Sequence, residues 1–296
     1  MLALKKFSSN LHLDSLVSKI QWTRSPPLKD ICQDLLSECR ELDRLCQSLT
    51  LAQWRTRSDF NGWTPWDEVA HLCYFDETGL QSARSSDEFA RDASLLAERL
   101  ALGQEISAIA RERYASLDGP ALLQHWRRLY EALVAALSLM DPKARLAWYG
   151  PPMGARSFAS ARLMETWAHG QDIWDVVGLV RPTSPRLKHI AHLGVTTFKW
   201  TFVNRKLPVP ETMPRVDLTA PDGSIWSWNE NSSDEFVKGR AADFCLLVTQ
   251  RRHLKETDLV FAGEVTGRWL SIVQCFAGPP ADGPPAGQRG RGALAW

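Results

Sequence analysis

The chain is 296 residues long, carries a net charge of +1, and is 44% hydrophobic and 23% charged, which is typical of a globular protein large enough for two domains. A charge balance this close to zero gives no electrostatic reason to expect nucleic acid or an anionic membrane surface as a partner. No segment approaches the ~20 consecutive apolar residues that a membrane-spanning helix needs, and the N-terminus lacks the apolar core of a secretion signal. We therefore expect a cytoplasmic protein that acts on a small molecule. Its 13 tryptophans are compatible with a homodimer but do not require one.

The six cysteines agree with a reducing compartment. Cys32, Cys39 and Cys46 recur every seven residues, which places them two turns apart along one face of a helix, where they serve as small hydrophobic side chains. Thiols at that spacing are too far apart to form a disulfide. Because the sequence contains no Cys-x-x-Cys pair, a zinc cluster of cysteines is disfavoured.

The first predicted elements are helices. Residues 1–26 are expected to be an N-terminal extension, and apolar residues at helical spacing then follow at Ile31, Leu35, Leu42, Leu45 and Leu49. Thr64 can cap a second helix, Pro65 suits its first position, and Asp67 places a carboxylate where free amide groups need acceptors. That helix is predicted to continue to about Arg84.

Further helices are predicted from similar patterns and from the residues that interrupt them. The stretch 87–113 is expected to contain one helix, a second is expected at 119–140 and a third at 157–177, with a stiff loop at 148–154. Four or five helices of this length with short connections fit an up-and-down bundle. We assign residues 27–178 to this bundle.

After Gly178 the pattern changes to short alternating segments. Arg215–Ala220 and Ser224–Trp228 flank an Asp-Gly pair, which predicts a β-hairpin. The other expected elements are helices at 185–206, 241–253 and 269–276 and strands at 234–239 and 259–263. Residues 179–277 are thus predicted to form a small α+β domain, so the fold class of the whole chain is α+β. The Gly/Pro-rich residues 278–296 are expected to be a disordered tail.

Three residues form a candidate metal site. Glu165 and His169 are four positions apart and project from the same face of one helix, while His71 lies on an apolar face of another. Metal sites in helical bundles are built from such groups on facing helices. Three nitrogen and oxygen ligands leave coordination positions open, which is typical of a catalytic rather than a structural site. On spacing alone, a solvated helix surface explains most such Glu–His pairs, and a histidine among apolar residues is usually a core residue.

Two aspartates lie one turn from the predicted imidazole ligands. Asp172 lies one turn beyond His169, and Asp67 lies one turn before His71. Either carboxylate can orient an imidazole by accepting its second N–H, or can act as a general base.

Longer motifs around these residues resemble a known family. Residues 62–72, Gly-Trp-Thr-Pro-Trp-Asp-Glu-Val-Ala-His-Leu, resemble the second-helix signature of the DinB-like superfamily. Residues 164–172, Met-Glu-Thr-Trp-Ala-His-Gly-Gln-Asp, resemble the Glu-x-x-x-His-x-x-Asp element of its mycothiol-dependent maleylpyruvate isomerase branch. Together with residues 148–153 and 243–253, these motifs are similar to a metal-binding family in that branch, some of whose members are labelled wyosine base formation domain-containing proteins. The resemblance covers about residues 28–278.

The resemblance implies a fold, a ligand set and an arginine. His71, Glu165 and His169 would bind a divalent ion in a DinB-like four-helix bundle, followed by a small sterol-carrier-like α+β domain. The ion is zinc in many relatives, although two histidines and a glutamate also suit nickel, cobalt, iron or manganese. In the isomerase an arginine from the second domain reaches the active site; Arg251 is the best match and Arg252 the second choice. A solvated helix end is the alternative interpretation of both arginines.

The resemblance also implies an enzyme. A thiol that coordinates a divalent metal loses its proton near neutral pH, and enzymes of the superfamily use this to activate a low-molecular-weight thiol cosubstrate such as mycothiol or bacillithiol. We expect an S-transferase or a cis–trans isomerase in which the thiolate adds to a small electrophile. Arg251 would pair with a carboxylate or a developing enolate, and Trp148 and Tyr149 would line the pocket. Two alternatives stay open: hydrolysis by a metal hydroxide with Asp172 or Asp67 as base, and a metal- or lipid-binding protein without turnover.

Overall fold

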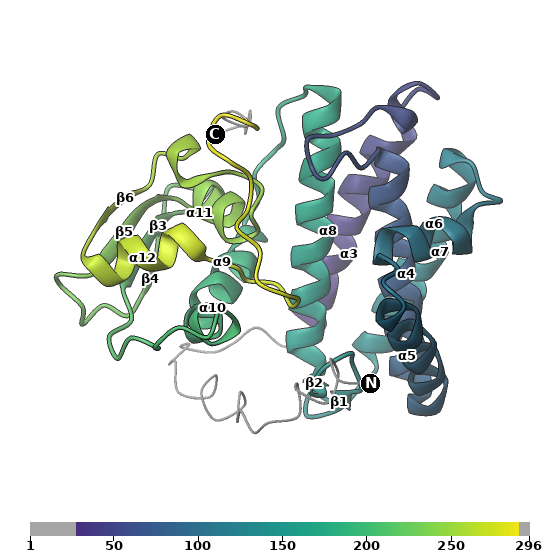
Figure 1. Ribbon diagram of the computed structural model, residues 1–296, viewed down its shortest axis with the longest axis horizontal. Coiled ribbons are helices and arrows are strands. Elements are labelled where there is room, and N and C mark those ends of the chain that lie inside the picture. Colours follow the sequence, from purple (N-terminus) through teal and green to yellow (C-terminus); the bar gives the residue numbers. More distant parts are fainter. Residues whose placement is uncertain (1–27, 290–296) are drawn as a thin grey trace. The chain divides into compact units, whose positions relative to one another are not determined.

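The computed structural model describes residues 28–289 of the chain (Figure 1). The extension predicted for residues 1–26 lies outside this range. In residues 28–289 most of the secondary structure is helical, and the strands form one two-stranded and one four-stranded sheet. This confirms the predicted α+β fold class. None of the helices between residues 28 and 289 is both long and apolar enough to cross a membrane.

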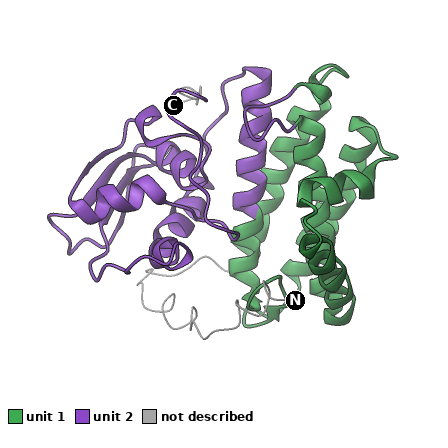
Figure 2. Cartoon of the chain, in the orientation of Figure 1, with its two compact units in different colours: residues 1–56, 64–162 green, residues 57–63, 163–296 purple. Residues whose placement is uncertain are grey.

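The chain divides into two compact units (Figure 2). The first comprises Met1–Thr56 and Thr64–Arg162, and the second comprises Arg57–Trp63 and Leu163–Trp296. The division falls inside helix α8 (Ala155–Val177), whereas the domain boundary expected from the sequence is residue 178. The metal-ligand segment of α8 is therefore counted with the second unit.

The first unit is built from amphipathic helices. They are α3 (Leu28–Gln47), α4 (Pro65–Arg84), α5 (Ser86–Ala101), α6 (Ile106–Tyr114), α7 (Gly119–Ser138) and the start of α8, with a short 3₁₀ turn, η2 (Gln53–Arg55). Helix α7 contacts both α3 and α4, and α4 also contacts α5 and α6. The start of α8 reaches α4 through Phe158, whose ring packs against Gly79. Cys32, Cys39 and Cys46 of α3 are buried, as expected for small hydrophobic side chains on one helix face.

A buried ion pair holds α8 against α4. Arg162 Nε donates a hydrogen bond to Asp76 Oδ1 at 2.9 Å, and Trp126 Nε1 donates to Asp76 Oδ2 at 2.8 Å. The arginine and the aspartate are both almost fully buried. Either charge alone would be costly at such a buried position. The pair therefore holds the start of α8 in a fixed orientation against α4, one helical turn before Glu165.

Two parts of the first unit differ from the prediction. The stretch 87–113 forms two helices rather than one, because Gly103 adopts a φ of +82° in the left-handed region just after α5. The loop expected at 148–154 is partly paired: β1 (Arg145–Leu146) and β2 (Met153–Gly154) form a short antiparallel ladder. The remaining loop is tied to α4 by a hydrogen bond from Ser82 Oγ to the Ala147 carbonyl at 2.6 Å.

Gly119, the first residue of α7, packs against the buried ring of Trp54. A Cβ at this position would lie 2.6 Å from Trp54 Cγ, which is closer than packed atoms approach. We therefore expect Gly119→Ala to lower the free energy of unfolding by about 1–3 kcal/mol, the usual cost of overpacking, as measured by urea denaturation. Gly150→Ala is the control, because no atom lies within 4 Å of its Cβ position. Equal stability of the two variants would contradict the close approach.

The second unit combines a small sheet with short helices. Besides the rest of α8, its elements are α9 (Leu187–Thr196), α10 (Phe198–Asn204), β3 (Arg215–Thr219), β4 (Ile225–Trp228), β5 (Phe236–Arg240), α11 (Ala241–Val248), η3 (Leu254–Glu256), β6 (Val260–Ala262) and α12 (Glu264–Ile272). The strand order is β4-β3-β5-β6. Strands β3 and β5 are parallel, and the two outer pairs are antiparallel. The predicted hairpin is confirmed, with Val216 opposite Trp228.

The helices of the second unit depart from the predicted ranges. The single helix expected at 185–206 is two helices, α9 and α10, which meet at Thr197. The last helix begins at Glu264 rather than at Trp269. The helix expected to reach residue 253 ends at Val248, and Gln250 then adopts a φ of +58°. Arg251 and Arg252 therefore follow a tight turn and do not lie on a solvated helix end.

Candidate metal centre

His71 belongs to a helix whose start is fixed by side chains. Thr64 caps α4, since its hydroxyl oxygen accepts from the Asp67 backbone N–H at 3.3 Å while its own backbone N–H donates to Asp67 Oδ2 at 2.9 Å. Arg111 Nε donates to Asp67 Oδ1 at 2.6 Å. Burial alone would raise the pKa of Asp67, but the hydrogen bonds from Arg111 and Thr64 outweigh it and lower that pKa. One Asp67 oxygen thus completes the helix cap and the other accepts from Arg111, while its role in orienting His71 or acting as a base stays a prediction.

Glu165 and His169 project from successive turns of α8, as their spacing predicts. His169 Nε2 lies 3.3 Å from Glu165 Oε2, so a nitrogen and an oxygen converge on the same space. The His169 side chain is 6% exposed and that of Glu165 is 25% exposed. The imidazole is therefore enclosed, while the carboxylate stays partly open.

Two aromatic rings from the segment before α4 enclose His169. The Trp63 ring stacks on the imidazole, with centroids 5.8 Å apart and an angle of 15° between the planes. The Phe60 ring meets the imidazole edge to face at 5.7 Å. These rings restrict the rotation of His169. No local pattern in the sequence could show that Phe60 packs on a residue more than a hundred positions away.

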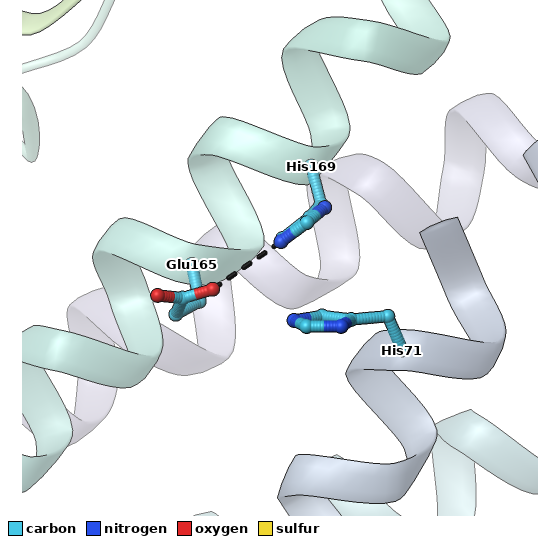
Figure 3. A group of neighbouring side chains, drawn as sticks. All are labelled: His71, Glu165 and His169. Carbon is cyan, nitrogen blue, oxygen red and sulfur yellow. Dashed lines mark ion pairs between the residues drawn. The ribbon is translucent and has the colours of Figure 1, made fainter. Parts of the chain in front are cut away.

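The three predicted ligands are drawn together in Figure 3. Glu165 and His169 lie on α8 in the second unit, and His71 on α4 in the first unit is the third member of this group of side chains that could hold a metal ion. Two imidazole nitrogens and one carboxylate oxygen form a donor set that zinc accepts in open sites, and that other divalent first-row metals also accept. The chemistry of these residues fits a divalent ion, and their assignment as its ligands stays a prediction.

Arg251 and Asp172 form a buried ion pair. Arg251 Nε lies 2.9 Å from Asp172 Oδ2, and the two side chains are 4% and 1% exposed. Arg251 also donates to the carbonyls of Ala168 at 3.1 Å and Thr249 at 2.8 Å. Its Nη2 is buried without a hydrogen-bond partner among residues 28–289. The guanidinium covers the Phe60 ring, with Cζ 4.3 Å from the centroid, and so lies on the same aromatic ring that contacts His169.

Arg252 is engaged differently. Its two terminal nitrogens donate to the two oxygens of Asp175, at 2.8 and 2.7 Å. This bidentate pair neutralises Arg252. Both of its terminal nitrogens already donate to Asp175, so they are not placed to bind a second carboxylate side by side. The choice between the two arginines is a prediction, and the geometry favours Arg251.

Trp148 and Tyr149, the predicted pocket residues, belong to an aromatic cluster of the first unit. The Trp148 ring stacks on Phe89, with centroids 5.6 Å apart, and meets Tyr149 edge to face at 4.9 Å. The Tyr149 ring lies 5.8 Å from Phe75, which in turn lies 4.7 Å from the imidazole of His71. Burial raises the pKa of Tyr149. The cluster therefore reaches the predicted ligand His71 through Phe75.

The C-terminal segment differs from the disordered tail that the sequence predicts. Residues 279–289, which we call the C-terminal strap, hydrogen-bond to the rest of the second unit; residues 290–296 lie outside the described part. The strap ends at Arg289, whose Nη1 donates to Asp172 Oδ1 at 2.8 Å. Sequence reasoning missed Arg289 because Gly/Pro-rich composition predicted disorder. Its partner lies 117 residues away, beyond the reach of any periodicity.

Comparisons with known proteins agree with this architecture. The model of the mycothiol maleylpyruvate isomerase N-terminal domain matches residues 35–174. The crystal structure of the mycothiol-dependent maleylpyruvate isomerase superimposes with a TM-score of 0.52, covering 76% of this chain and 90% of that chain at 14% sequence identity. A mutant of the same enzyme gives a TM-score of 0.51. At this identity the likeness shows the fold, which is that of the isomerase.

Two relatives have a higher sequence identity to this chain than the isomerase of known structure. They are uncharacterized proteins of Mycobacterium tuberculosis, from strains CDC 1551 / Oshkosh and ATCC 25618 / H37Rv. Each is 40% identical over 254 residues, which span 84% of this chain and 96% of the relative. The chain belongs to the mycothiol-dependent maleylpyruvate isomerase family.

Proposed function

We propose that this chain is a divalent-metal-dependent enzyme that uses a low-molecular-weight thiol, mycothiol in the first instance, to isomerise or to S-conjugate a small electrophile. The convergence of His169 Nε2 and Glu165 Oε2 on one space carries the proposal, and His71 is proposed as the third ligand. Membership of the family supports it, because the relative of known structure is named as a mycothiol-dependent isomerase. Zinc is our first choice of ion.

A divalent ion held by these residues would supply the positive charge that favours a thiolate over a thiol. The protein's own part is to fix the ligand geometry and limit water. Phe60 and Trp63 hold the His169 ring in one orientation. The partial exposure of Glu165 gives a small molecule access to the same space. Trp148 and Tyr149 are proposed as an apolar wall near His71.

Arg251 is proposed to bind the electrophile. Its buried Nη2 has no hydrogen-bond partner among the described residues, so a substrate carboxylate or developing enolate would gain a charge-assisted hydrogen bond there. Asp172 acts as a positioning residue, since it fixes the Arg251 guanidinium through Nε.

Hydrolysis is less well supported. Hydrolysis needs a general base near the ion, and the two candidate bases, Asp67 and Asp172, already accept hydrogen bonds from other residues. Asp67 caps α4 and pairs with Arg111, and Asp172 accepts from two guanidinium groups. Burial raises the pKa of Asp172 while both arginines oppose that shift, and each of its oxygens already accepts a hydrogen bond from a guanidinium group.

The test is consumption of an electrophile by the metal-loaded protein with and without mycothiol. The panel contains maleylpyruvate, as an enoyl keto acid, and an alkyl halide. Turnover is expected only with the thiol, and His71→Ala is expected to lower its rate by about 100-fold or more. An isomerase returns the thiol unchanged, whereas a transferase consumes one thiol for each thioether formed.

Other outcomes would point elsewhere. Consumption at the same rate without thiol would support hydrolysis. If metal removal lowered the melting temperature but no electrophile in the panel reacted, the chain would be a binding protein without turnover.

A further inference from the structure

The C-terminal strap is held along the second unit by hydrogen bonds at several points. Gln250 Nε2 donates to the Ala281 carbonyl at 2.6 Å, and the Ala281 N–H donates to Gln274 Oε1 at 3.0 Å. Arg205 Nη1 lies 2.7 Å from Asp282 Oδ1. Near the end of the strap, the Gly287 N–H donates to Glu256 Oε1 at 2.6 Å. These contacts bring the last described residue, Arg289, to a defined place.

Arg289 is buried next to Arg251. Its side chain is 5% exposed, and its Nη1 donates to Asp172 Oδ1 at 2.8 Å and to the Arg251 carbonyl at 3.4 Å. Its Cζ lies 5.1 Å from the Phe60 centroid, over the ring that Arg251 also covers. One carboxylate and one aromatic ring are therefore shared by two guanidinium groups.

Each of these arginines retains a buried donor. Among residues 28–289, Arg251 Nη2 and Arg289 Nε have no hydrogen-bond partner, and both atoms are shielded from solvent. A buried guanidinium N–H without an acceptor is costly. Because both guanidinium groups pair with Asp172 and cover the Phe60 ring, these two donors favour an acceptor supplied from outside the chain.

The charges around these donors favour an anion. Asp172 supplies one negative charge to two guanidinium groups, and Asp175 is already used by Arg252. Within the second unit, three guanidinium groups (Arg251, Arg252 and Arg289) therefore pair with two carboxylates. A carboxylate matches both the charge and the forked geometry of paired guanidinium donors.

We infer that Arg289, carried by the C-terminal strap, joins Arg251 to form a binding subsite for a carboxylate, and that Arg289 determines the preference for anionic substrates. The inference rests on the proposed function for its role in turnover, but carboxylate binding itself does not need the metal or the thiol. Arg251 came from the family motif, whereas Arg289 lies outside the segment that resembles the family.

The test is isothermal titration of the full-length protein with succinate. We expect Arg289→Met to weaken succinate binding about 10- to 100-fold, the loss of one charge-assisted hydrogen bond in a buried site. Arg289→Lys, which keeps the charge but loses the fork, should lie in between. The control is Arg268→Met, since Arg268 is exposed on α12. Succinamide, which has the same shape without charge, should not bind detectably.

The outcomes separate this inference from the proposed function. Equal affinity of the unchanged protein and Arg289→Met for succinate, or no succinate binding by the unchanged protein, would overturn it. Arg289→Met should leave the metal content unchanged and raise the KM for an anionic electrophile more than it lowers kcat. Circular dichroism of both Arg289 variants checks that the fold is kept, and Arg289→Lys alone decides the matter if Arg289→Met does not fold. If the metal-site assignment were wrong, the affinity for succinate would still be lower in the Arg289→Met variant than in the unchanged protein.

Discussion

A chain carrying both Glu165→Ala and His169→Ala is expected to retain less than about one tenth of the divalent metal bound by the unchanged protein. The two side chains converge on one space at 3.3 Å, and the loss of two of three ligands leaves too few donors to hold an ion tightly. The measurement is elemental analysis after dialysis against metal-free buffer. His71→Ala alone should weaken binding but leave a detectable amount, because two ligands remain on α8.

The matched control removes a histidine and a glutamate from another helix of the bundle. His125→Ala with Glu131→Ala on α7 changes the same residue types, and neither belongs to a candidate metal group among residues 28–289. Its metal content should equal that of the unchanged protein. Full metal content in the Glu165, His169 double variant would eliminate the site.

Asp172→Ala is expected to destabilise the protein by about 3–5 kcal/mol, the usual cost of removing one partner of a buried ion pair. The substitution would leave Arg251 and Arg289 buried without their shared carboxylate. The free energy of unfolding from urea denaturation measures the effect. Adding Arg289→Met to Asp172→Ala should recover part of the loss, because one of the two stranded charges is then gone.

Asp282→Ala provides the comparison for this prediction. Asp282 also pairs with an arginine, but its side chain is 88% exposed. Pairs at the surface contribute little, so the stability should change by less than about 1 kcal/mol. A similar loss in both variants would mean that the environment of Asp172 is not as enclosed as its contacts indicate.

Local patterns predicted the elements that carry the candidate ligands. The Thr64, Pro65 and Asp67 signals gave the start of α4, and the four-residue spacing of Glu165 and His169 placed both on one face of α8. These features depend only on neighbouring residues and on the helical repeat. Helix interruptions such as that at Gly103 were missed, because a single glycine is tolerated in a helix and only its backbone conformation shows the break.

The parts of the site that could not be predicted from the sequence depend on contacts between residues far apart in the chain. Phe60 beside His169, and Arg289 on Asp172, are pairings that the folded backbone creates. Composition described the strap only as rich in glycine and proline, which is equally compatible with disorder and with an ordered segment that follows a surface. The roles of Arg251 and Arg252 were likewise separated only by the carboxylates that each one meets.

The capped start of α4 also bears on the thermodynamics of metal uptake. His71 lies one turn beyond Asp67, in a part of the helix that the Thr64 and Arg111 contacts keep from fraying. The conformational entropy of ordering that turn is therefore spent during folding and not when an ion arrives. Calorimetry of metal binding should accordingly show a small heat-capacity change, unlike a zinc finger, where the ion orders the chain around itself.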